Sequence, residues 1–309
     1  MFRFIVRRVL LMIPTFIGAS ALIFFAGFAL PGDPVSAFGG ERALSENTRA
    51  ILEARYRLDQ PLINQYIGYM GDVVLDFDFG ESVLRRRSVN SIFWDAFPNT
   101  VRLALLAITI EITIGLAAGV LAALRKGRFI DQLVLVTTTL VVAIPVFVLG
   151  FASQNLLGVR FEIFPIAGLN EGFKSYLLPA FVLAALSLAY VARLTRTSLV
   201  ETMRQDYIRT AQAKGLRPSR VTGRHGLRNA LIPVVTYIGI DLAFLMGGAI
   251  VTETVFNIPG VGFALVRAIG TRDNAIVVGF TMAAVIIFLL ISLVIDLLYA
   301  VLDPRIRYE

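Results

Sequence analysis

Long apolar stretches alternate with shorter polar segments along this chain, and six of the stretches are long enough to cross a membrane. A spanning helix needs about 20 mostly apolar residues. Because backbone polar groups in hydrocarbon must bond to one another, each stretch is predicted to be a helix. The pattern therefore predicts an all-α integral membrane protein with six transmembrane helices. The stretches are Val9–Leu30, Leu103–Leu124, Leu133–Leu157, Tyr176–Ala192, Leu231–Phe256 and Ala275–Leu302.

Lysine and arginine are distributed unevenly between the segments that join these stretches. The segments on the side of the N-terminus hold 17 of them. The two short loops on the other side hold four, namely Arg160, Lys174, Arg267 and Arg272. The long segment after the first stretch is left out, because long loops cross a membrane regardless of charge. Since short cytoplasmic loops collect basic residues, both termini are predicted to be cytoplasmic.

Composition narrows the classes of function. Hydrophobic residues make up 57% of the chain and charged residues 17%, against about 25% charged in a soluble domain. The absence of cysteine excludes disulfides and thiolate metal sites, and His225 is the single histidine. A net charge of +7 on a soluble protein would suggest a nucleic-acid partner, but here the cytoplasmic loops account for it. We therefore expect contact with membrane lipid and no nucleic-acid partner.

The polar segments suggest four regions. The first apolar stretch has 22 residues, longer than the core of a signal peptide at about 7–15, so it is expected to remain as an anchor. Two helices, Ser45–Leu58 and Leu62–Leu75, are predicted in the segment that follows it. The regions are residues 1–30, the N-terminal end and first helix; 31–99, an extracytoplasmic cap; 100–302, a transmembrane core that includes a cytoplasmic loop at 193–230; and 303–309, a cytoplasmic tail.

The cytoplasmic loop at 193–230 is predicted to fold as a helix, a tight turn and a second helix. Lys214 falls in the last turn of the first helix, and Gly215 suits the position just after a helix end. Pro218 cannot continue that helix but fits the first turn of the next one, predicted at about Ser219–Leu231. Small residues at the turn, Ala211, Ala213 and Gly215, would let another surface approach closely. This pattern predicts a docking element, although a solvated basic loop is the alternative.

Several segments together resemble one known family. Asp206–Gly215 and Arg224–Pro233 are similar to the signature loop of ABC importer permeases, most closely to the peptide and nickel subfamily. Further resemblance lies in Leu30–Pro34, Leu58–Leu62, Asp78–Gly80, Gly247–Phe256, Ile258–Gly262 and Asp303–Arg305, so it covers the whole chain. One departure is at Leu227 and Arg228, where other importers have Leu-Pro. Here the proline is delayed to Pro233, which weakens any transfer of detail from sugar importers.

The resemblance implies a type I ABC importer permease fold and a set of partners. These are a second, homologous permease, two cytosolic ATPase subunits, and an extracytoplasmic binding protein or lipoprotein. ATP and magnesium would be bound by the ATPase subunits, so the chain itself is expected to carry no cofactor or metal. The short helix around Ala211–Gly215 would dock into an ATPase cleft. The expected coupling residues are Asp206, Tyr207, Arg209, Thr210, Ala211, Ala213, Lys214, Gly215 and Arg217.

Catalytic motifs do not occur in the sequence. A phosphate-binding loop needs Gly-Lys followed by Ser or Thr, and none of Lys126, Lys174 and Lys214 follows a glycine. Nucleophile-elbow, HExxH and EF-hand patterns are also absent. The chain is therefore predicted to be a non-catalytic subunit that receives its energy from a partner.

Charged and polar residues inside predicted spans are candidates for a substrate pathway. Glu111, Asp241, Gln154 and Asn155 are interpreted in this way, with satisfied structural positions as the alternative. Glu253 and Phe256 are candidates for an outer gate or a contact with the binding protein.

The resulting prediction is a multi-pass permease subunit in the bacterial cytoplasmic membrane that imports di- or oligopeptides. Nickel or glutathione transport within the same family remains an alternative. A self-contained secondary transporter would need paired ionisable groups at mid-membrane or inverted repeats, and neither is evident from the sequence. A membrane-embedded enzyme is a third alternative that the missing motifs disfavour.

Overall fold

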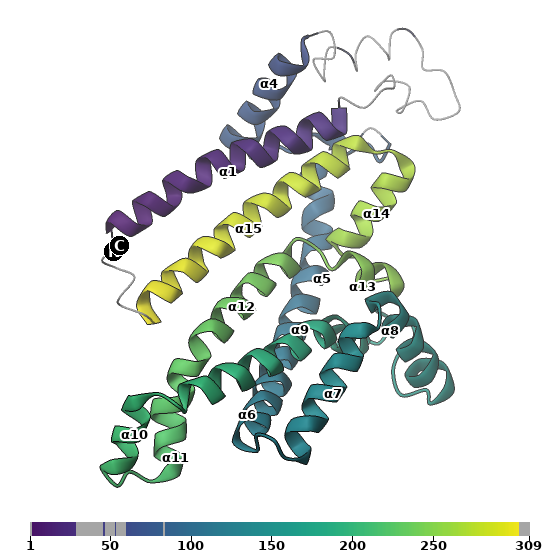
Figure 1. Ribbon diagram of the computed structural model, residues 1–309. Coiled ribbons are helices and arrows are strands. Elements are labelled where there is room, and N and C mark those ends of the chain that lie inside the picture. Colours follow the sequence, from purple (N-terminus) through teal and green to yellow (C-terminus); the bar gives the residue numbers. More distant parts are fainter. Residues whose placement is uncertain (1, 29–45, 47–52, 54–59, 83, 303–309) are drawn as a thin grey trace.

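A computed structural model describes residues 2–28, 46, 53, 60–82 and 84–302. Helices dominate this part of the chain (Figure 1). Within it, five helical segments are long and apolar enough to cross a membrane, and a bent pair of helices makes a sixth candidate. The predicted all-α membrane architecture is therefore confirmed, but two of the six predicted spans are not continuous helices.

Two short strands pair antiparallel, with Glu81 opposite Ser88. The elements are given below in chain order. Three π-helical turns are labelled η. The elements are α1 (Phe2–Phe28), α4 (Leu62–Leu75), β1 (Glu81–Ser82), β2 (Arg87–Ser88), α5 (Val89–Ile110), η1 (Glu111–Gly115), α6 (Leu116–Leu124), α7 (Phe129–Ala143), α8 (Val146–Ser153), η2 (Gln154–Arg160), α9 (Lys174–Thr202), α10 (Asp206–Ala213), α11 (Pro218–Arg220), η3 (Val221–Leu227), α12 (Arg228–Met246), α13 (Ile250–Val255), α14 (Val261–Thr271) and α15 (Asn274–Leu302).

The first helix, α1, lies along α15 at one side of the bundle (Figure 1). Gly27 allows close approach there, because a Cβ at this position would lie 2.4 Å from Cγ2 of Val278. Toward the other end of α1, Arg8 forms an ion pair with Asp296 of α15. The first helix is therefore attached to the rest of the described chain mainly through α15.

In the predicted cap, α4 has the same bounds as the predicted helix Leu62–Leu75. It packs on α1 through Tyr66, whose hydroxyl lies 2.8 Å from Oγ of Ser20. The other predicted cap helix, Ser45–Leu58, lies outside the described residues apart from single positions.

The second span is a continuous helix of 36 residues formed by α5, η1 and α6. It begins well before the predicted Leu103, because Asp95 and Arg102 interrupt the apolar run without interrupting the helix. Glycines place it close to α9: a Cβ on Gly119 would lie 2.5 Å from the carbonyl oxygen of Ala192.

The third predicted span, Leu133–Leu157, is wrong as a single helix. It is a pair of helices, α7 and α8–η2, bent by 100°. Pro145 has no N–H to donate and restricts the residue before it to extended conformations. Ile144 accordingly has φ −93° and ψ 124°, so the chain turns there.

The fifth predicted span, Leu231–Phe256, is also wrong at its outer end. The helix α12 stops at Met246, and Gly248 has φ +113°, a conformation that L side chains rarely adopt. A Cβ on Gly248 would lie 2.9 Å from the backbone nitrogen of Gly262. The glycine therefore lets the chain turn into α13 and pack against the start of α14.

The fourth span, α9, lies in the middle of the bundle and packs against α5, α6, α7, α8 and α12 (Figure 1). It runs past Arg193 and ends at Thr202. Two groups of buried side chains surround the long helices. One joins α5, α9, α12 and α13 and includes Leu103 and Phe256, and the other joins α5, α14 and α15 and includes Phe93 and Phe280.

We predict that Gly119→Ala lowers the thermal stability of the chain. The added methyl group has no space against α9, and overpacking typically costs about 1–3 kcal/mol. The measurement is the midpoint of thermal unfolding in detergent. Gly18→Ala is the matched control, because a Cβ at that helical position meets no atom within 4 Å. Equal losses of stability in the two variants would contradict this packing.

Candidate functional site

The predicted helix, turn and helix of the cytoplasmic loop are present, as α10, a four-residue turn, and α11 followed by η3. The second of these helices runs without a break into α12 and ends at Met246. Both lie at one end of the molecule, and α4 lies at the opposite end (Figure 1). The loop is therefore a projection formed directly by the ends of two long helices, α9 and α12.

The turn has the hydrogen bonds of a glycine-terminated helix. The backbone N–H of Gly215 donates to the carbonyl oxygen of Gln212 at 2.9 Å, and the N–H of Leu216 donates to that of Ala211 at 3.4 Å. Gly215 has φ +73°, and a Cβ there would meet no atom within 4 Å. Conformation, and not lack of space, thus requires glycine at this position.

A small apolar core holds α10 against η3. Ile208, Ala211 and Val221 are buried in it, and Met203 and Leu216 pack around them. The prediction that Ala211 offers a small surface to a partner is therefore corrected: its side chain is 6% exposed and faces the inside of the loop. The loop therefore has a small apolar core of its own.

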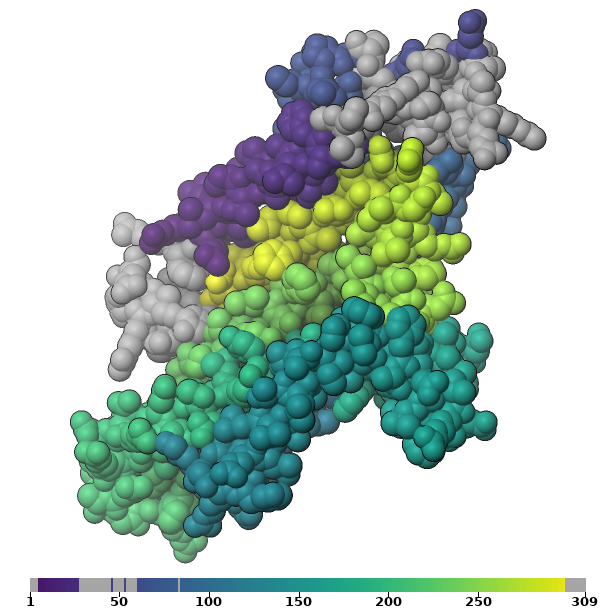
Figure 2. Space-filling model, turned by 45° about the vertical axis from the view of Figure 1, so that its right-hand side comes forward, coloured from purple at the N-terminus to yellow at the C-terminus, as the bar shows by residue number. Residues whose placement is uncertain are grey.

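The other predicted coupling residues face outward. Tyr207 is tied to the base of the loop, because the side-chain amide of Asn229 donates to its hydroxyl at 3.0 Å. Arg209 lies 3.4 Å from Asp206 in a fully solvated pair, which contributes little to stability. The segment that contains α10 and its turn, coloured green, forms the lower left end of the space-filling view (Figure 2). The exposed members of the predicted set are Asp206, Tyr207, Arg209, Thr210, Ala213, Lys214, Gly215 and Arg217.

This surface is strongly basic. Seven exposed cationic residues lie between 204 and 228, and Asp206 is the single exposed acidic residue in that interval. Such a surface favours a partner with an acidic face. The cationic residues are Arg204, Arg209, Lys214, Arg217, Arg220, Arg224 and Arg228.

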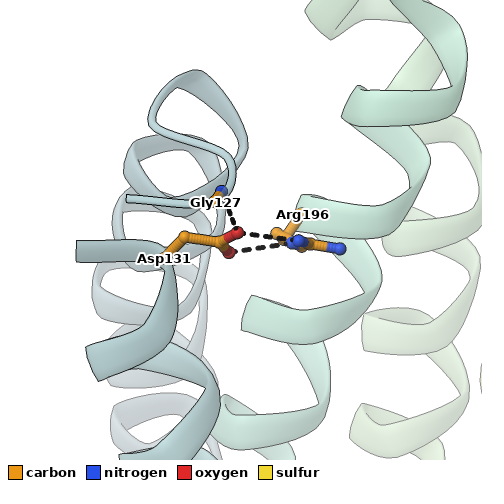
Figure 3. Close-up of polar contacts among 3 residues, drawn as sticks. All are labelled: Gly127, Asp131 and Arg196. Carbon is orange, nitrogen blue, oxygen red and sulfur yellow. Dashed lines mark hydrogen bonds and ion pairs between the residues drawn. The ribbon is translucent and has the colours of Figure 1, made fainter. Parts of the chain in front are cut away.

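A buried ion pair fixes α9 near the loop, and the sequence did not predict it (Figure 3). Nε and Nη2 of Arg196 donate to the two carboxylate oxygens of Asp131 at 2.9 and 2.8 Å. The backbone N–H of Gly127 donates to the same carboxylate at 2.8 Å. In the sequence, Arg196 is one of several basic residues near the predicted loop. Its partner Asp131 lies 65 positions away, so no local pattern links the two residues.

The predicted pathway residues have different surroundings. Glu111 is fully buried and Asp241 is partly buried, and neither oxygen of the Glu111 carboxyl has a hydrogen-bond partner among the described residues. Gln154 is buried, and its amide donates to the carbonyl oxygens of Ile166 and Val255 at 2.8 and 3.0 Å. Asn155 is exposed. Of the four, Asn155 is the exposed one, and Asp241 is partly accessible.

Glu253 and Phe256 are both in the interior, with 0% and 1% exposure. The Glu253 carboxylate accepts hydrogen bonds from Oγ1 of Thr100 at 2.8 Å and from the backbone N–H of Phe263 at 3.0 Å. It thereby joins α5, α13 and α14. A direct contact with a binding protein is not available to this side chain here, and a gating role stays a prediction.

Comparison with known proteins decides the family. Residues 115–308 match the model of the binding-protein-dependent transport system inner membrane component, and residues 1–104 match that of its N-terminal region. The chain belongs to this family. This permease is accordingly a multi-pass protein of the bacterial inner membrane, and the suspected relationship is confirmed.

Relatives match this permease over its full length. It is 38% identical over 336 residues to the di/tripeptide transport system permease protein DppB of Pseudomonas aeruginosa (strain UCBPP-PA14), with 100% of each chain covered. It is 39% identical to the dipeptide transport system permease protein DppB of Bacillus subtilis (strain 168), with 99% of this chain and 98% of the relative covered. It is 37% identical to the glutathione transport system permease protein GsiC of Escherichia coli (strain K12), with 100% of each covered.

A solved structure supports the fold. A chain of the MetNI methionine ABC transporter, in inward-facing conformations, aligns with a TM-score of 0.54 and 19% identity. The alignment covers 69% of this permease and 96% of that chain. The type I importer permease fold is therefore confirmed.

We predict that Asp131→Asn lowers the unfolding midpoint strongly. The substitution removes the counter-charge of Arg196, whose side chain is 20% exposed, so the cost lies below the value of about 3–5 kcal/mol for removing one partner of a fully buried pair. Asp95→Asn is the matched control, since its pair with Arg87 is solvent-exposed on both sides and contributes about 0–1 kcal/mol. If both variants unfold at the wild-type temperature, Asp131 does not fix α9.

Proposed function

We propose that this permease is one of two related membrane subunits of an ABC importer that carries di- or oligopeptides into the cell. The observation that carries the proposal is the full-length similarity to permeases named for dipeptide and di/tripeptide transport. Partner ATPase subunits supply the energy by hydrolysing ATP, and an extracytoplasmic binding protein delivers the peptide.

The chain in this proposal has no catalytic role. Its sequence contains no phosphate-binding loop, and the described residues include no group of three His, Cys, Asp or Glu side chains able to hold a metal. ATP and magnesium belong to the ATPase partners. Both chain termini and the loop carrying α10 are on the cytoplasmic side, in line with the distribution of Lys and Arg.

The basic face of α10 and its turn is the proposed docking surface for an ATPase subunit. Ala213 and Gly215 expose little side chain at its tip, so a cleft wall can approach the backbone. The core of Ile208, Ala211 and Val221 makes the loop rigid enough to transmit force. Because α9 enters this loop and α12 leaves it, displacement of the loop moves both helices.

A second permease subunit is expected to cover part of the apolar surface that a single chain leaves exposed. Large side chains on the bent pair, such as Phe147, Phe151 and Leu156, are about half exposed at 50%, 56% and 45%. Contact with lipid accounts for the remainder of that surface.

Glutathione is the second candidate substrate, because a relative named for glutathione transport is 37% identical over its whole length. The chemistry is close, since glutathione is itself a small modified peptide. Substrate choice is expected to depend largely on the binding protein, so the same membrane subunit is compatible with either.

We predict that Ala213→Trp abolishes transport without unfolding the chain. The bulky ring projects from an exposed position and blocks the cleft, and a loss of about ten-fold or more corresponds to at least about 1.4 kcal/mol of docking energy. The measurement is ATP-dependent uptake of a labelled dipeptide by proteoliposomes containing the complete complex. Unlabelled glutathione added as competitor distinguishes the two substrate classes.

Two controls accompany this variant. Asn64→Trp places the same ring on an exposed position of α4, at the opposite end of the molecule, and should leave uptake unchanged. Ala211→Trp should instead lower the unfolding midpoint, because Ala211 is buried within the loop. Wild-type uptake by the Ala213→Trp complex would refute the docking surface.

A further inference from the structure

A cavity of about 480 Å³ lies between α5 and the segment that leads into α9. Small-molecule sites typically measure about 300–1,000 Å³, so the cavity is large enough to hold a ligand. No step of the proposed function uses it. Its lining comes from both walls and includes Arg102, Leu105, Leu106, Leu169, Phe173 and Tyr176.

The lining presents one cation above apolar walls. The side chain of Arg102 is exposed, and no hydrogen bond or ion pair joins its guanidinium to another described residue. The hydroxyl of Tyr176 is already used, because it donates to Oδ1 of Asn99 at 2.8 Å. Beside the lining, Glu171 and Lys174 offset each other in an ion pair of 3.2 Å. The cavity therefore offers an anion the guanidinium of Arg102.

Both walls are fixed by contacts within the chain. Tyr176 is buried, and the side-chain amide of its partner Asn99 donates to the carbonyl oxygen of Pro259 at 2.9 Å. On the other wall, the backbone N–H of Gly168 donates to the carbonyl oxygen of Phe256 at 2.9 Å. A site held in this way requires little ordering when a ligand binds.

The position of Arg102 along the second span places it at a membrane surface. The basic turn after α6 begins at Arg125, 23 positions later. At a rise of 1.5 Å per residue this is about 35 Å of helix, slightly more than a hydrocarbon core of about 30 Å. Between the two arginines, Glu111 is the one charged residue, and it is buried. Arg102 and Arg125 therefore lie at opposite headgroup layers, at the depth of the lipid phosphates.

The walls suit a lipid better than a peptide. A peptide carries an N–H and a C=O at nearly every residue, and these groups need hydrogen-bond partners that the apolar walls lack. A phospholipid needs a cation for its phosphate and an apolar surface below it. Leu105 and Leu106 lie one turn from Arg102 toward the bilayer centre. Leu105 and Phe173 are 52% and 65% exposed and so are available to an acyl chain.

We propose that this cavity binds a phospholipid with a net negative headgroup. Its phosphate accepts two parallel hydrogen bonds from the guanidinium of Arg102, and the first part of an acyl chain lies between Leu105 and Phe173. A headgroup with its own ammonium group binds less well, because that charge offsets the phosphate. The bound lipid joins α5 to the start of α9, at the end of α9 away from the docking loop. The site does not depend on which substrate is carried.

The test is photolabelling of the full chain in phosphatidylcholine nanodiscs that contain a trace of phosphatidylglycerol with a photoreactive acyl chain. Labelled peptides are mapped by mass spectrometry, and the specific signal is the part displaced by unlabelled phosphatidylglycerol. Specific labelling is expected on both walls of the cavity. In Arg102→Gln it should fall about ten-fold, because the charge-assisted hydrogen bonds to the phosphate are lost.

Two further variants accompany Arg102→Gln. Leu105→Glu places a carboxylate one turn from Arg102 at an exposed position and should also abolish the specific labelling, so it replaces Arg102→Gln if that variant does not fold. Arg160→Gln is the matched control and should label like the wild type, because Arg160 is exposed but does not line the cavity.

Three results would overturn the proposal. The first is specific labelling that is unchanged in Arg102→Gln and in Leu105→Glu. The second is displacement of the label by a dipeptide, which would make the cavity a peptide site. The third is displacement by inorganic phosphate, which would show that the cavity takes a free anion and does not require a lipid.

Discussion

Close packing of helices around α9 is the constraint on which the rest of this structure depends. In hydrocarbon, apolar side chains gain little by leaving lipid for protein, so helix association depends on van der Waals contact and on polar groups between helices. Small residues provide that contact here. Gly115 and Gly119 bring the second span against α9, where an added Cβ would overlap Val191 or the backbone of Ala192.

The same close packing determines what polar groups can do. Water is excluded between the helices, so a buried carboxyl depends on hydrogen-bond donors within the chain. Asp131 forms an ion pair with Arg196, and this pair fixes the start of α7 to α9 close to the docking loop. Glu253 accepts hydrogen bonds from a hydroxyl and from backbone N–H groups. These bonds hold α13, the short helix after α12, in place.

Local signals explain which parts of the fold could be predicted from the sequence. Runs of apolar residues located the five long apolar helices and the bent pair in outline. Gly215 with Pro218 located the turn of the docking loop, because each signal lies within a few consecutive residues. The start of α4 directly after Pro61 is a local signal of the same kind. The breaks at Pro145 and Gly248 lie inside apolar runs, where hydropathy alone does not show them.

Other features depend on contacts between distant segments. Ala211 is small enough to let a partner protein approach closely. In the structure, however, α10 packs on Val221, and the Ala211 side chain faces the inside of the loop. The pair of Asp131 and Arg196 joins residues on different helices. Their sequence positions indicate charge at membrane depth and do not indicate which charges meet.

In the proposed function the docking loop and α12 move as one body, because one helix runs from Pro218 in the loop to Met246, whereas the first helix does not enter the loop. Because the chain contains no cysteine, pairs of introduced cysteines can carry spin labels at exposed positions, and distances can be measured in the complete complex with and without bound nucleotide. Labels at Ala213 and Ile240 should keep their distance, whereas labels at Ala213 and Leu22 should change theirs. A change between Ala213 and Ile240, with Ile240 and Leu22 unchanged, would show that the loop moves alone and would contradict the account.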